Sequence, residues 1–267
     1  SLLVLSKNCY AYDKKIEVET PQGKLIITPM SQNAVRFQLT NEKSTLMPEY
    51  VYIENNKGVK YSVSEKSGKV ALELKNMSVE VDKGSGELVV KDGKGNSIFS
   101  GVRMSLTPAE VQGKSTQKAE LSFFSPLDEY LNGLGEFQDG YLNVRGLSRR
   151  LTQVNTQISV PMIISDRGYG LQWNNYGLTD FNPCSNSVTL VRNSSPSKKS
   201  VVDQTTSEGN QKAEILSNNF IGELNIEEDG NYALLLDMGQ KMARSHNLII
   251  DGDTVIDMHN IWLPPTT

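Results

Sequence analysis

Apolar and polar residues alternate along the first hundred residues of this chain, and this alternation restricts the possible folds more than any other feature. Every second residue is apolar in segments such as Val35–Leu39, Val70–Leu74 and Val79–Val81. Because successive side chains of a strand point to opposite faces of a sheet, these segments predict strands with one buried face. No segment of this region has the apolar spacing of an amphipathic helix of three turns. The sequence therefore predicts an all-β fold.

Short segments rich in glycine separate the predicted strands. They are Pro21–Gly23, Lys66–Gly68, Lys83–Gly86 and Lys91–Gly95. Turn residues at this close spacing are expected where consecutive strands of a β-sandwich are neighbours. Residues 131–181 continue the strand pattern with more glycine, asparagine and aromatic residues, which indicates long loops that carry function.

The composition excludes several functional classes. The chain has 267 residues, 37% of them hydrophobic and 22% charged, which is ordinary for a folded protein and indicates no membrane protein. Its net charge is -4, and it has no dense run of lysine and arginine. Because binding to a phosphate backbone requires a concentrated basic surface, we expect no nucleic acid as a partner.

The first eleven residues resemble the remainder of a signal peptide. Ser1–Ser6 are largely apolar, and a small residue, Ala11, follows at a suitable cleavage position. A short buried strand is the alternative, and lipoprotein-type cleavage before Cys9 is less favoured. If cleavage follows Ala11, Cys184 is the one cysteine left and no internal disulfide can form. We therefore expect a secreted or periplasmic bacterial protein.

The composition changes after residue 184. Asparagine, serine, threonine, lysine and glutamine dominate residues 185–212, which predicts a linker without regular packing. A new apolar pattern then begins at Ile215 and includes Tyr232–Leu236 and Leu248–Ile250. An Asp251–Gly252 pair inside it is typical of a hairpin turn rather than of a calcium loop. We expect residues 12–184 to form one β domain and residues 213–267 to form a second, partial β-rich unit.

Few residues of the sequence point to chemistry of their own. His246 and His259 are the only histidines, and no metal site or cofactor is predicted. A glycosidase needs two carboxyl groups on either side of the scissile bond. Four carboxylates lie in the glycine-rich region, and nothing in their spacing marks a catalytic pair: Glu136, Asp139, Asp166 and Asp180. We expect them to be surface and turn residues.

Three motifs follow one another between residues 131 and 175. They are Leu131–Gly146 with its Gly-Leu-Gly-Glu core, Leu151–Ser165 with its Gln-Val-Asn-Thr-Gln-Ile-Ser-Val-Pro run, and Gly168–Asn175. In this order they resemble the amino-terminal β-sandwich of glycoside hydrolase family 31, and the resemblance implies a galactose-mutarotase-like sandwich (supersandwich). The second unit resembles a protective-antigen-like (PA14-like) module inserted in some family members, through Phe220–Leu224 and Glu228–Tyr232 among other segments.

The resemblance also implies a function. Family members are retaining α-glycosidases, such as α-xylosidases and α-glucosidases, that remove terminal α-linked sugars from oligosaccharides and polysaccharides such as xyloglucan fragments. Their catalytic aspartates lie in a (β/α)₈ barrel that is absent from this sequence, so no catalytic residue is assigned. We expect carbohydrate and the missing barrel of the same polypeptide as partners, and an inactive piece when the chain is alone. The alternative is a stand-alone carbohydrate-binding or adhesin-like β-sandwich protein.

Candidate substrate contacts follow from the same resemblance. Asn155, Thr156 and Gln157 occupy the loop that in family members reaches the rim of the active site, where amide and hydroxyl groups suit sugar hydroxyls. Such side chains can instead satisfy backbone groups of an irregular loop. Trp262 is the candidate for an exposed aromatic residue that contacts sugar in the inserted module. Trp173 and Tyr176 are aromatic residues that could also stack on sugar rings, and for Trp173 core packing is favoured.

Overall fold

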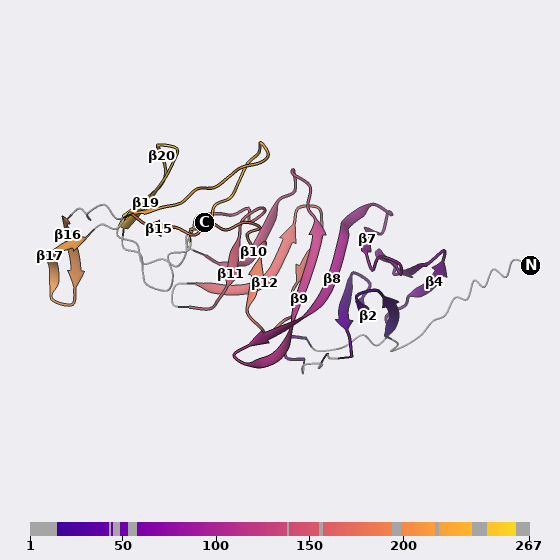
Figure 1. The fold of residues 1–267 in the computed structure, drawn as a ribbon. Helices are drawn as coiled ribbons and strands as arrows, with labels where there is room; N and C mark the ends of the chain where they lie inside the picture. Colours follow the sequence, from indigo (N-terminus) through magenta and orange to yellow (C-terminus); the bar gives the residue numbers. More distant parts are fainter. Residues whose placement is uncertain are drawn as a thin grey trace, which may run out of the picture. The chain divides into compact units, whose positions relative to one another are not determined.

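The computed structural model describes residues 15–42, 44, 49–52, 58–137, 139–154, 157–193, 199–216, 219–236 and 245–259. The regular secondary structure in these ranges consists of β-strands, which confirms the all-β prediction (Figure 1). Within the same ranges, no helix is long and apolar enough to cross a membrane. The predicted signal-peptide remainder, residues 1–11, lies outside the described residues.

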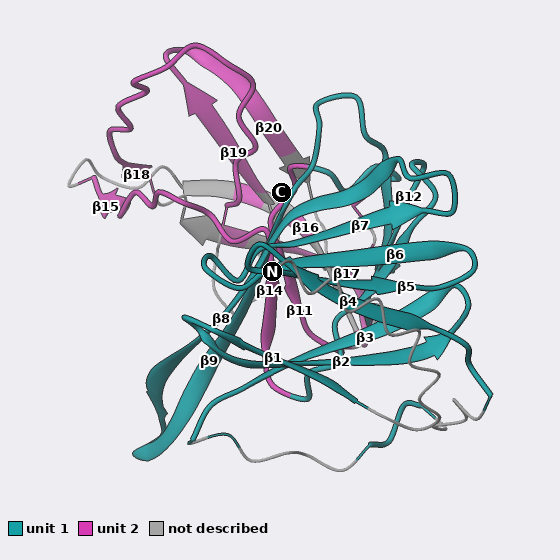
Figure 2. Cartoon of the chain, turned by 90° about the vertical axis from the view of Figure 1, so that its right-hand side faces the viewer, with its two compact units in different colours: residues 1–135, 142–145, 160–176 teal, residues 136–141, 146–159, 177–267 magenta. Residues whose placement is uncertain are grey.

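The chain forms two compact units (Figure 2). Unit 1 comprises residues 1–135, 142–145 and 160–176, and unit 2 comprises residues 136–141, 146–159 and 177–267. The units alternate along the sequence between residues 136 and 176. The predicted division into residues 12–184, 185–212 and 213–267 places its boundaries elsewhere, and it stays a prediction.

The described residues of unit 1 form three sheets, of which the first two are antiparallel. The first has the order β1-β2-β3, with β1 at Ile16–Thr20, β2 at Gly23–Ser31 and β3 at Ala34–Thr40. The second joins six consecutive strands, β4 at Ser62–Lys66, β5 at Lys69–Glu73, β6 at Met77–Asp82, β7 at Leu88–Asp92, β8 at Ser97–Val111 and β9 at Lys114–Phe124. The third has the order β10-β12-β13, with β10 at Leu131–Glu136, β12 at Ile158–Ser165 and β13 at Gly170–Gln172. The predicted strands at Val35–Leu39, Val70–Leu74 and Val79–Val81 correspond to β3, β5 and β6, although β5 ends one residue early.

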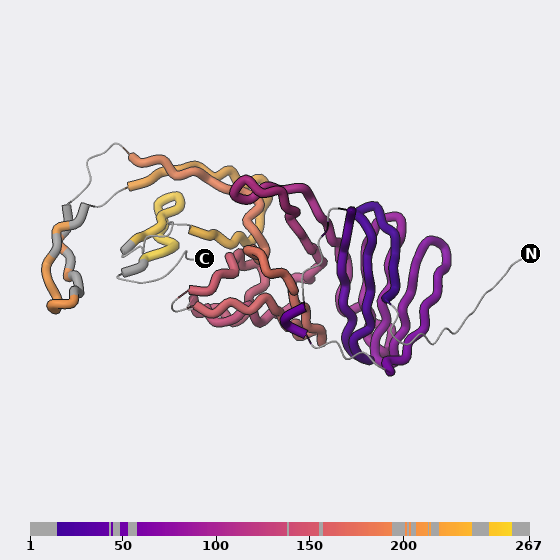
Figure 3. Tube along the Cα trace, turned by 90° about the horizontal axis from the view of Figure 1, so that it is seen from below, coloured from indigo at the N-terminus to yellow at the C-terminus, as the bar shows by residue number. Residues whose placement is uncertain are grey.

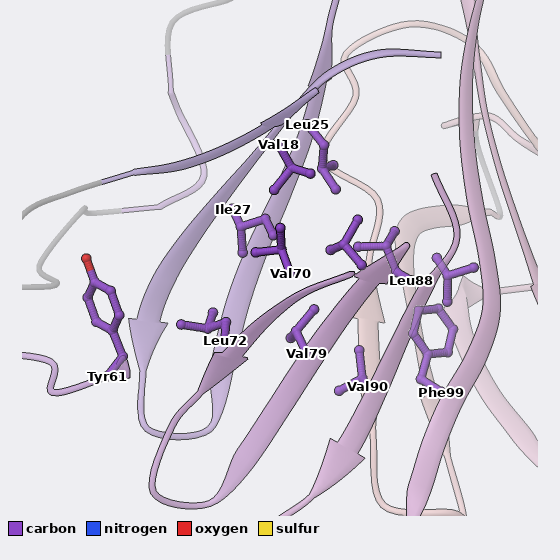
Figure 4. Packing of buried hydrophobic residues seen from close by; sticks show 12 residues of the cluster. Val18, Leu25, Ile27, Tyr61, Val70, Leu72, Val79, Leu88, Val90 and Phe99 are labelled. Carbon is purple, nitrogen blue, oxygen red and sulfur yellow. The ribbon is translucent and has the colours of Figure 1, made fainter. Parts of the chain in front are cut away.

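The main core lies between the first two sheets of unit 1. Val18, Leu25 and Ile27 of β1 and β2 are buried in one cluster with residues of the six-stranded sheet, including Val70 and Leu72. Figure 4 shows Ile27 and Val70 pointing toward each other. Burying each such side chain stabilises the fold by about 1.5–3 kcal/mol. Since the buried residues come from two facing sheets, this part of the chain is a β-sandwich, whose indigo and purple strands run side by side in Figure 3.

The Gly-Leu-Gly motif has a structural explanation in β10. Gly133 has a φ of 129°, and a Cβ added to it would lie 2.2 Å from the carbonyl oxygen of Met162 on the neighbouring strand β12. Only glycine allows two backbones to approach this closely at a positive φ. The motif is therefore needed to join β10 to β12.

The part of unit 2 that the structure describes forms four pairs of antiparallel strands. They are β11 at Arg149–Leu151 with β14 at Thr179–Phe181, β15 at Val191–Arg192 with β18 at Phe220–Ile221, β16 at Lys199–Thr206 with β17 at Gly209–Leu216, and β19 at Ser245–Ile250 with β20 at Asp253–His259. Strand β15, strand β16 and the start of β17 therefore fall inside the predicted linker. The predicted Asp251–Gly252 turn joins β19 to β20 and is confirmed. The apolar segment Tyr232–Leu236 forms no regular strand.

Candidate functional site

The predicted substrate loop is only partly described. Asn155, Thr156 and Trp262 lie outside the described residues. Gln157 is 6% exposed, and its amide nitrogen donates hydrogen bonds to the carbonyl oxygen of Thr152 at 2.9 Å and to its hydroxyl at 3.3 Å. These are the bonds of a side chain that satisfies loop backbone, which is the alternative given above for this loop. A role of Gln157 at a substrate entrance stays a prediction.

The arginines near this loop hold other side chains. In unit 2, the guanidinium of Arg149 lies 2.5 Å from the carboxylate of Asp139 and 4.5 Å from the ring centre of Phe137. The Arg149 side chain is only 4% exposed, so the ion pair and the cation–π contact offset part of the loss of water around its charge, while its buried Nε has no hydrogen-bond partner. Arg150 makes a second ion pair with Asp180 at 2.9 Å.

The four carboxylates singled out by the sequence lie in different surroundings. Asp139 and Asp180 are bound to arginines of unit 2, as described above. Asp166 accepts a hydrogen bond from the backbone N–H of Tyr130 at 3.0 Å, and Glu136 is exposed. That none of them belongs to a catalytic pair stays a prediction. Among the described residues, no three histidine, cysteine or acidic side chains are grouped so as to hold a metal ion.

Unit 1 contains a buried carboxylate that the sequence did not indicate. Glu129 is 2% exposed and accepts hydrogen bonds from the hydroxyls of Ser125, Ser165 and Tyr169 at 2.5, 2.6 and 2.7 Å. Ser125 in turn accepts a hydrogen bond from Arg145 at 3.1 Å. The cluster joins the segment after β9 to the end of β12 and the start of β13. It acts as a polar tie inside the sandwich.

The environment of Glu129 changes the acidity of two groups. Burial, the largest influence, would raise the pKa of the Glu129 carboxyl, but the three hydroxyl donors and the nearby charge of Arg167 together lower it below its ordinary value. The pKa of Tyr169 is raised strongly, first by burial and then by its hydrogen bond to Glu129. Glu129 is therefore a carboxylate and Tyr169 a neutral phenol at neutral pH.

A second polar cluster of unit 1 lies at the protein surface, and we call it the Glu49 clamp. One carboxylate oxygen of Glu49 accepts the backbone N–H groups of Val51 and Tyr52 at 2.8 and 3.1 Å. The other oxygen lies 2.9 Å from the guanidinium of Arg36 and accepts the side-chain amide of Asn174 at 3.0 Å. The hydrogen bond from the Val51 N–H is the largest influence on the pKa of Glu49 and lowers it, whereas burial raises it. The Tyr52 N–H, Arg36 and Asn174 lower it further, so that the pKa of Glu49 lies below its ordinary value.

Three tyrosines adjoin this clamp, and we call them the tyrosine surface: Tyr50, Tyr52 and Tyr176. They are 75%, 37% and 46% exposed, respectively. The hydroxyl of Tyr176 accepts the backbone N–H of Tyr50 at 3.0 Å, and the hydroxyl of Tyr52 donates to the side-chain oxygen of Gln172. Local sequence could not reveal this site, because it joins residues more than a hundred positions apart.

Strand β12 presents apolar side chains on both of its faces. Ile163 is buried, at 3% exposure, whereas Val160, Met162 and Ile164 on the opposite face are 44%, 36% and 55% exposed. We call these three residues of unit 1 the β12 apolar face. A strand with one face in water normally alternates apolar and polar residues. The sequence of β12 instead suits a strand that is covered on both sides.

Known proteins similar in sequence are glycoside hydrolases. An α-xylosidase from Saccharolobus solfataricus is 33% identical over 133 residues, which cover 46% of this chain and 17% of that protein. An uncharacterized family 31 glucosidase from Pseudescherichia vulneris is 49% identical over 47 residues, which cover 18% of this chain and 9% of that protein. No protein-family model matches the chain.

Two solved structures with a similar fold are α-xylosidases of family 31. The enzyme from Xanthomonas citri superposes with a TM-score of 0.62 at 19% identity, over 80% of this chain and 24% of that one. An enzyme from a soil metagenome, solved in complex with xylose, gives a TM-score of 0.54 at 26% identity, over 66% of this chain and 29% of that one. In sequence and in fold, this chain is therefore homologous to the α-xylosidases of glycoside hydrolase family 31 over part of their length.

Proposed function

We propose that this chain is the non-catalytic sandwich portion of a secreted α-glycosidase of the α-xylosidase or α-glucosidase type. The parent enzyme removes terminal α-linked sugars from oligosaccharides such as xyloglucan fragments. The named relatives support this activity, and the chain covers less than a third of the length of each of them. The catalytic carboxylates belong to a (β/α)₈ barrel outside this chain, and the sandwich packs on that barrel and shapes the entrance to its active site.

The β12 apolar face is the observation that carries this proposal. Its residues Val160, Met162 and Ile164 keep 44%, 36% and 55% of their surface in water, and this exposed part contributes no hydrophobic stabilisation. A second apolar layer on this face would remove them from water, as the core already does for Ile163. The barrel of the same polypeptide is the partner that a non-catalytic sandwich needs beside it.

The carboxylates of the chain support its lack of catalytic activity. A retaining glycosidase needs two carboxyl groups about 5–5.5 Å apart on either side of the bond that is cleaved. Glu129 is enclosed by three hydroxyl donors, and Asp139 is bound to Arg149. Groups engaged in this way are not placed to act on a sugar. We therefore expect the chain alone to hydrolyse no chromogenic α-xyloside or α-glucoside.

A charge on the β12 apolar face tests the proposal. In the full-length parent, Ile164→Lys should lower the melting temperature and the kcat on p-nitrophenyl α-xyloside, because a lysine would be buried at the contact with the barrel. The same substitution in the 267-residue chain should leave its melting temperature unchanged. Val111→Lys is the control, since Val111 is 59% exposed at the end of β8.

Two results would contradict the proposal. One is a full-length Ile164→Lys variant that is as stable and active as the unmodified enzyme and the Val111→Lys control. The other is hydrolysis of either chromogenic substrate by the purified 267-residue chain. A parent gene that encodes a cell-wall anchor in place of a barrel would favour the binding-protein alternative.

A further inference from the structure

The tyrosine surface and the Glu49 clamp together form a site for which the proposed function gives no role. We propose that Tyr50 and Tyr176 bind a neutral pyranose ring of an oligosaccharide, with Tyr52, Gln172 and the Glu49 clamp as support. The proposal takes the sugar class from the proposed function and adds a binding site on the sandwich itself. It involves binding only and no chemical step.

The two aromatic rings present apolar faces to water. Tyr50 is 75% exposed and Tyr176 is 46% exposed. Their ring centres lie 5.6 Å apart, and the ring planes are inclined by 49°. The rings therefore contact each other at an angle and leave a bent aromatic surface open. The C–H groups of a pyranose can pack against such a surface and remove it from water.

The exposed tyrosines are held in place by hydrogen bonds rather than by burial. Glu49 fixes the backbone of Val51 and Tyr52, on the chain directly after Tyr50, and the hydroxyl of Tyr176 fixes the backbone of Tyr50 itself. Glu49 is also bound to strand β3 through Arg36, and to the segment after β13 through Asn174. A rigid aromatic surface loses less conformational entropy when it binds a ligand than a mobile one. This arrangement therefore favours binding.

The charges of the site favour a neutral ligand. The carboxylate of Glu49 and the guanidinium of Arg36 lie 2.9 Å apart and cancel each other, and the lowered pKa of Glu49 keeps this pair ionised at neutral pH. The uncharged polar groups of the site include the phenol of Tyr52 and the amide of Gln172, which are joined by one hydrogen bond. Phenols and amides both donate and accept hydrogen bonds, as sugar hydroxyls do. A phosphate or a charged peptide would gain no net attraction here.

Ligand titration of the 267-residue chain tests the proposal. Xyloglucan heptasaccharide and isomaltotriose serve as probes, and binding is followed by saturation-transfer NMR and by calorimetry. At least one probe should bind the unmodified chain, and Tyr50→Ala should weaken that binding about fivefold or more, as expected when an aromatic contact of typical strength is lost. Tyr141→Ala is the matched control, because Tyr141 is 50% exposed and lies outside the tyrosine surface. It should leave the affinity unchanged.

A second variant separates stacking from positioning. Tyr176→Phe keeps the ring and removes the hydroxyl that accepts the Tyr50 N–H, so it should weaken binding less than Tyr50→Ala. The proposal is overturned if neither probe binds the unmodified chain, or if Tyr50→Ala and Tyr141→Ala bind equally well. Either of these results leaves the proposed function standing, because the test of the β12 apolar face measures stability and turnover in the parent enzyme and no binding to this surface.

Discussion

The two units bury different kinds of side chain. Unit 1 encloses a cluster of aliphatic residues, of which Ile27 and Leu72 are fully buried. Among the described residues of unit 2, Leu147 is the only buried hydrophobic residue, and the polar side chains of Arg149 and Gln157 are buried as deeply or more so. Unit 1 is therefore stabilised mainly by the hydrophobic effect, and the described part of unit 2 by ion pairs and hydrogen bonds. Composition alone conceals this difference, because apolar residues occur in both units.

Exposed apolar residues reinforce the contrast. In unit 2, Phe220, Ile221, Leu224 and Ile226 are each between 46% and 59% exposed. The sheets of unit 2 have two strands each, and isolated two-stranded sheets are only marginally stable in water. We therefore expect unit 2 to unfold at a lower denaturant concentration than unit 1. Hydrogen exchange, measured for each segment as denaturant is added, tests this expectation.

The largest expected effect comes from the core of unit 1. Leu72→Ala should reduce the free energy of unfolding of unit 1 by about 3–5 kcal/mol, because Leu72 has no exposed surface and its removal leaves a cavity. Leu224→Ala in unit 2 should change the free energy of unfolding of unit 2 by about 0.5 kcal/mol or less. Urea unfolding followed by hydrogen exchange measures both. Equal losses would show that the units do not differ as described.

The next largest effect concerns the buried ion pair of unit 2. Arg149→Ala should reduce the free energy of unfolding of unit 2 by about 2–4 kcal/mol, because it leaves the carboxylate of Asp139 without its partner. Hydrogen exchange of the β11 and β14 amides reports this loss. The double variant Arg149→Met with Asp139→Asn should recover part of it, and failure to recover any would assign the effect to packing against Phe137.

Glycine substitutions compare backbone contacts in the two units. Gly133→Ala should destabilise unit 1 by about 2 kcal/mol or more, since the new Cβ meets the backbone of Met162 at a positive φ. Gly209→Ala at the β16–β17 turn also has a positive φ but meets no atom within 4 Å, so it should cost about 1 kcal/mol. Thermal unfolding of both variants measures the difference between their losses of stability. Equal losses would show that β10 and β12 do not approach each other closely at Gly133.

The smallest expected effect is a pH dependence in unit 1. The pKa of Glu129 is lower in the folded chain than its ordinary value, so the unfolded chain binds the proton more tightly. The stabilisation of unit 1 by the Glu129 carboxylate is therefore complete above about pH 5, and it is lost as the pH falls through the folded-state pKa of Glu129. Glu129→Gln should cost about 1–2 kcal/mol at pH 7. Urea midpoints of the two proteins should converge as the pH falls through the folded-state pKa of Glu129, and parallel curves would rule out this role.

Local sequence predicted the strands well and the contacts between them poorly. Alternation is a property of neighbouring residues, so β3, β5 and β6 could be located without a structure, and so could the Asp251–Gly252 turn. The hydrophobic pattern at Tyr232–Leu236 was misleading, since apolar residues form a strand only where a neighbouring strand pairs with them. The strands inside residues 185–212 were missed because their residues are mostly polar.

The polar clusters were beyond the reach of sequence patterns. Glu129 and Glu49 are ordinary acidic residues until tertiary folding brings Tyr169 and Arg36 beside them. The Gly-Leu-Gly motif was recognised as a resemblance, but its physical cause, the approach of Gly133 to Met162, needed coordinates. Side chains that act through distant partners leave no periodic signal.

The alternation of the two units along the chain has a consequence for how such a protein can be divided. Between residues 136 and 176 the backbone passes repeatedly from one unit to the other. A single break in the gene therefore cannot release either unit whole, and recombination at one site cannot exchange one of them for a foreign module. This stretch must be inherited as one block, whereas the turns of outlying hairpins remain open to insertion.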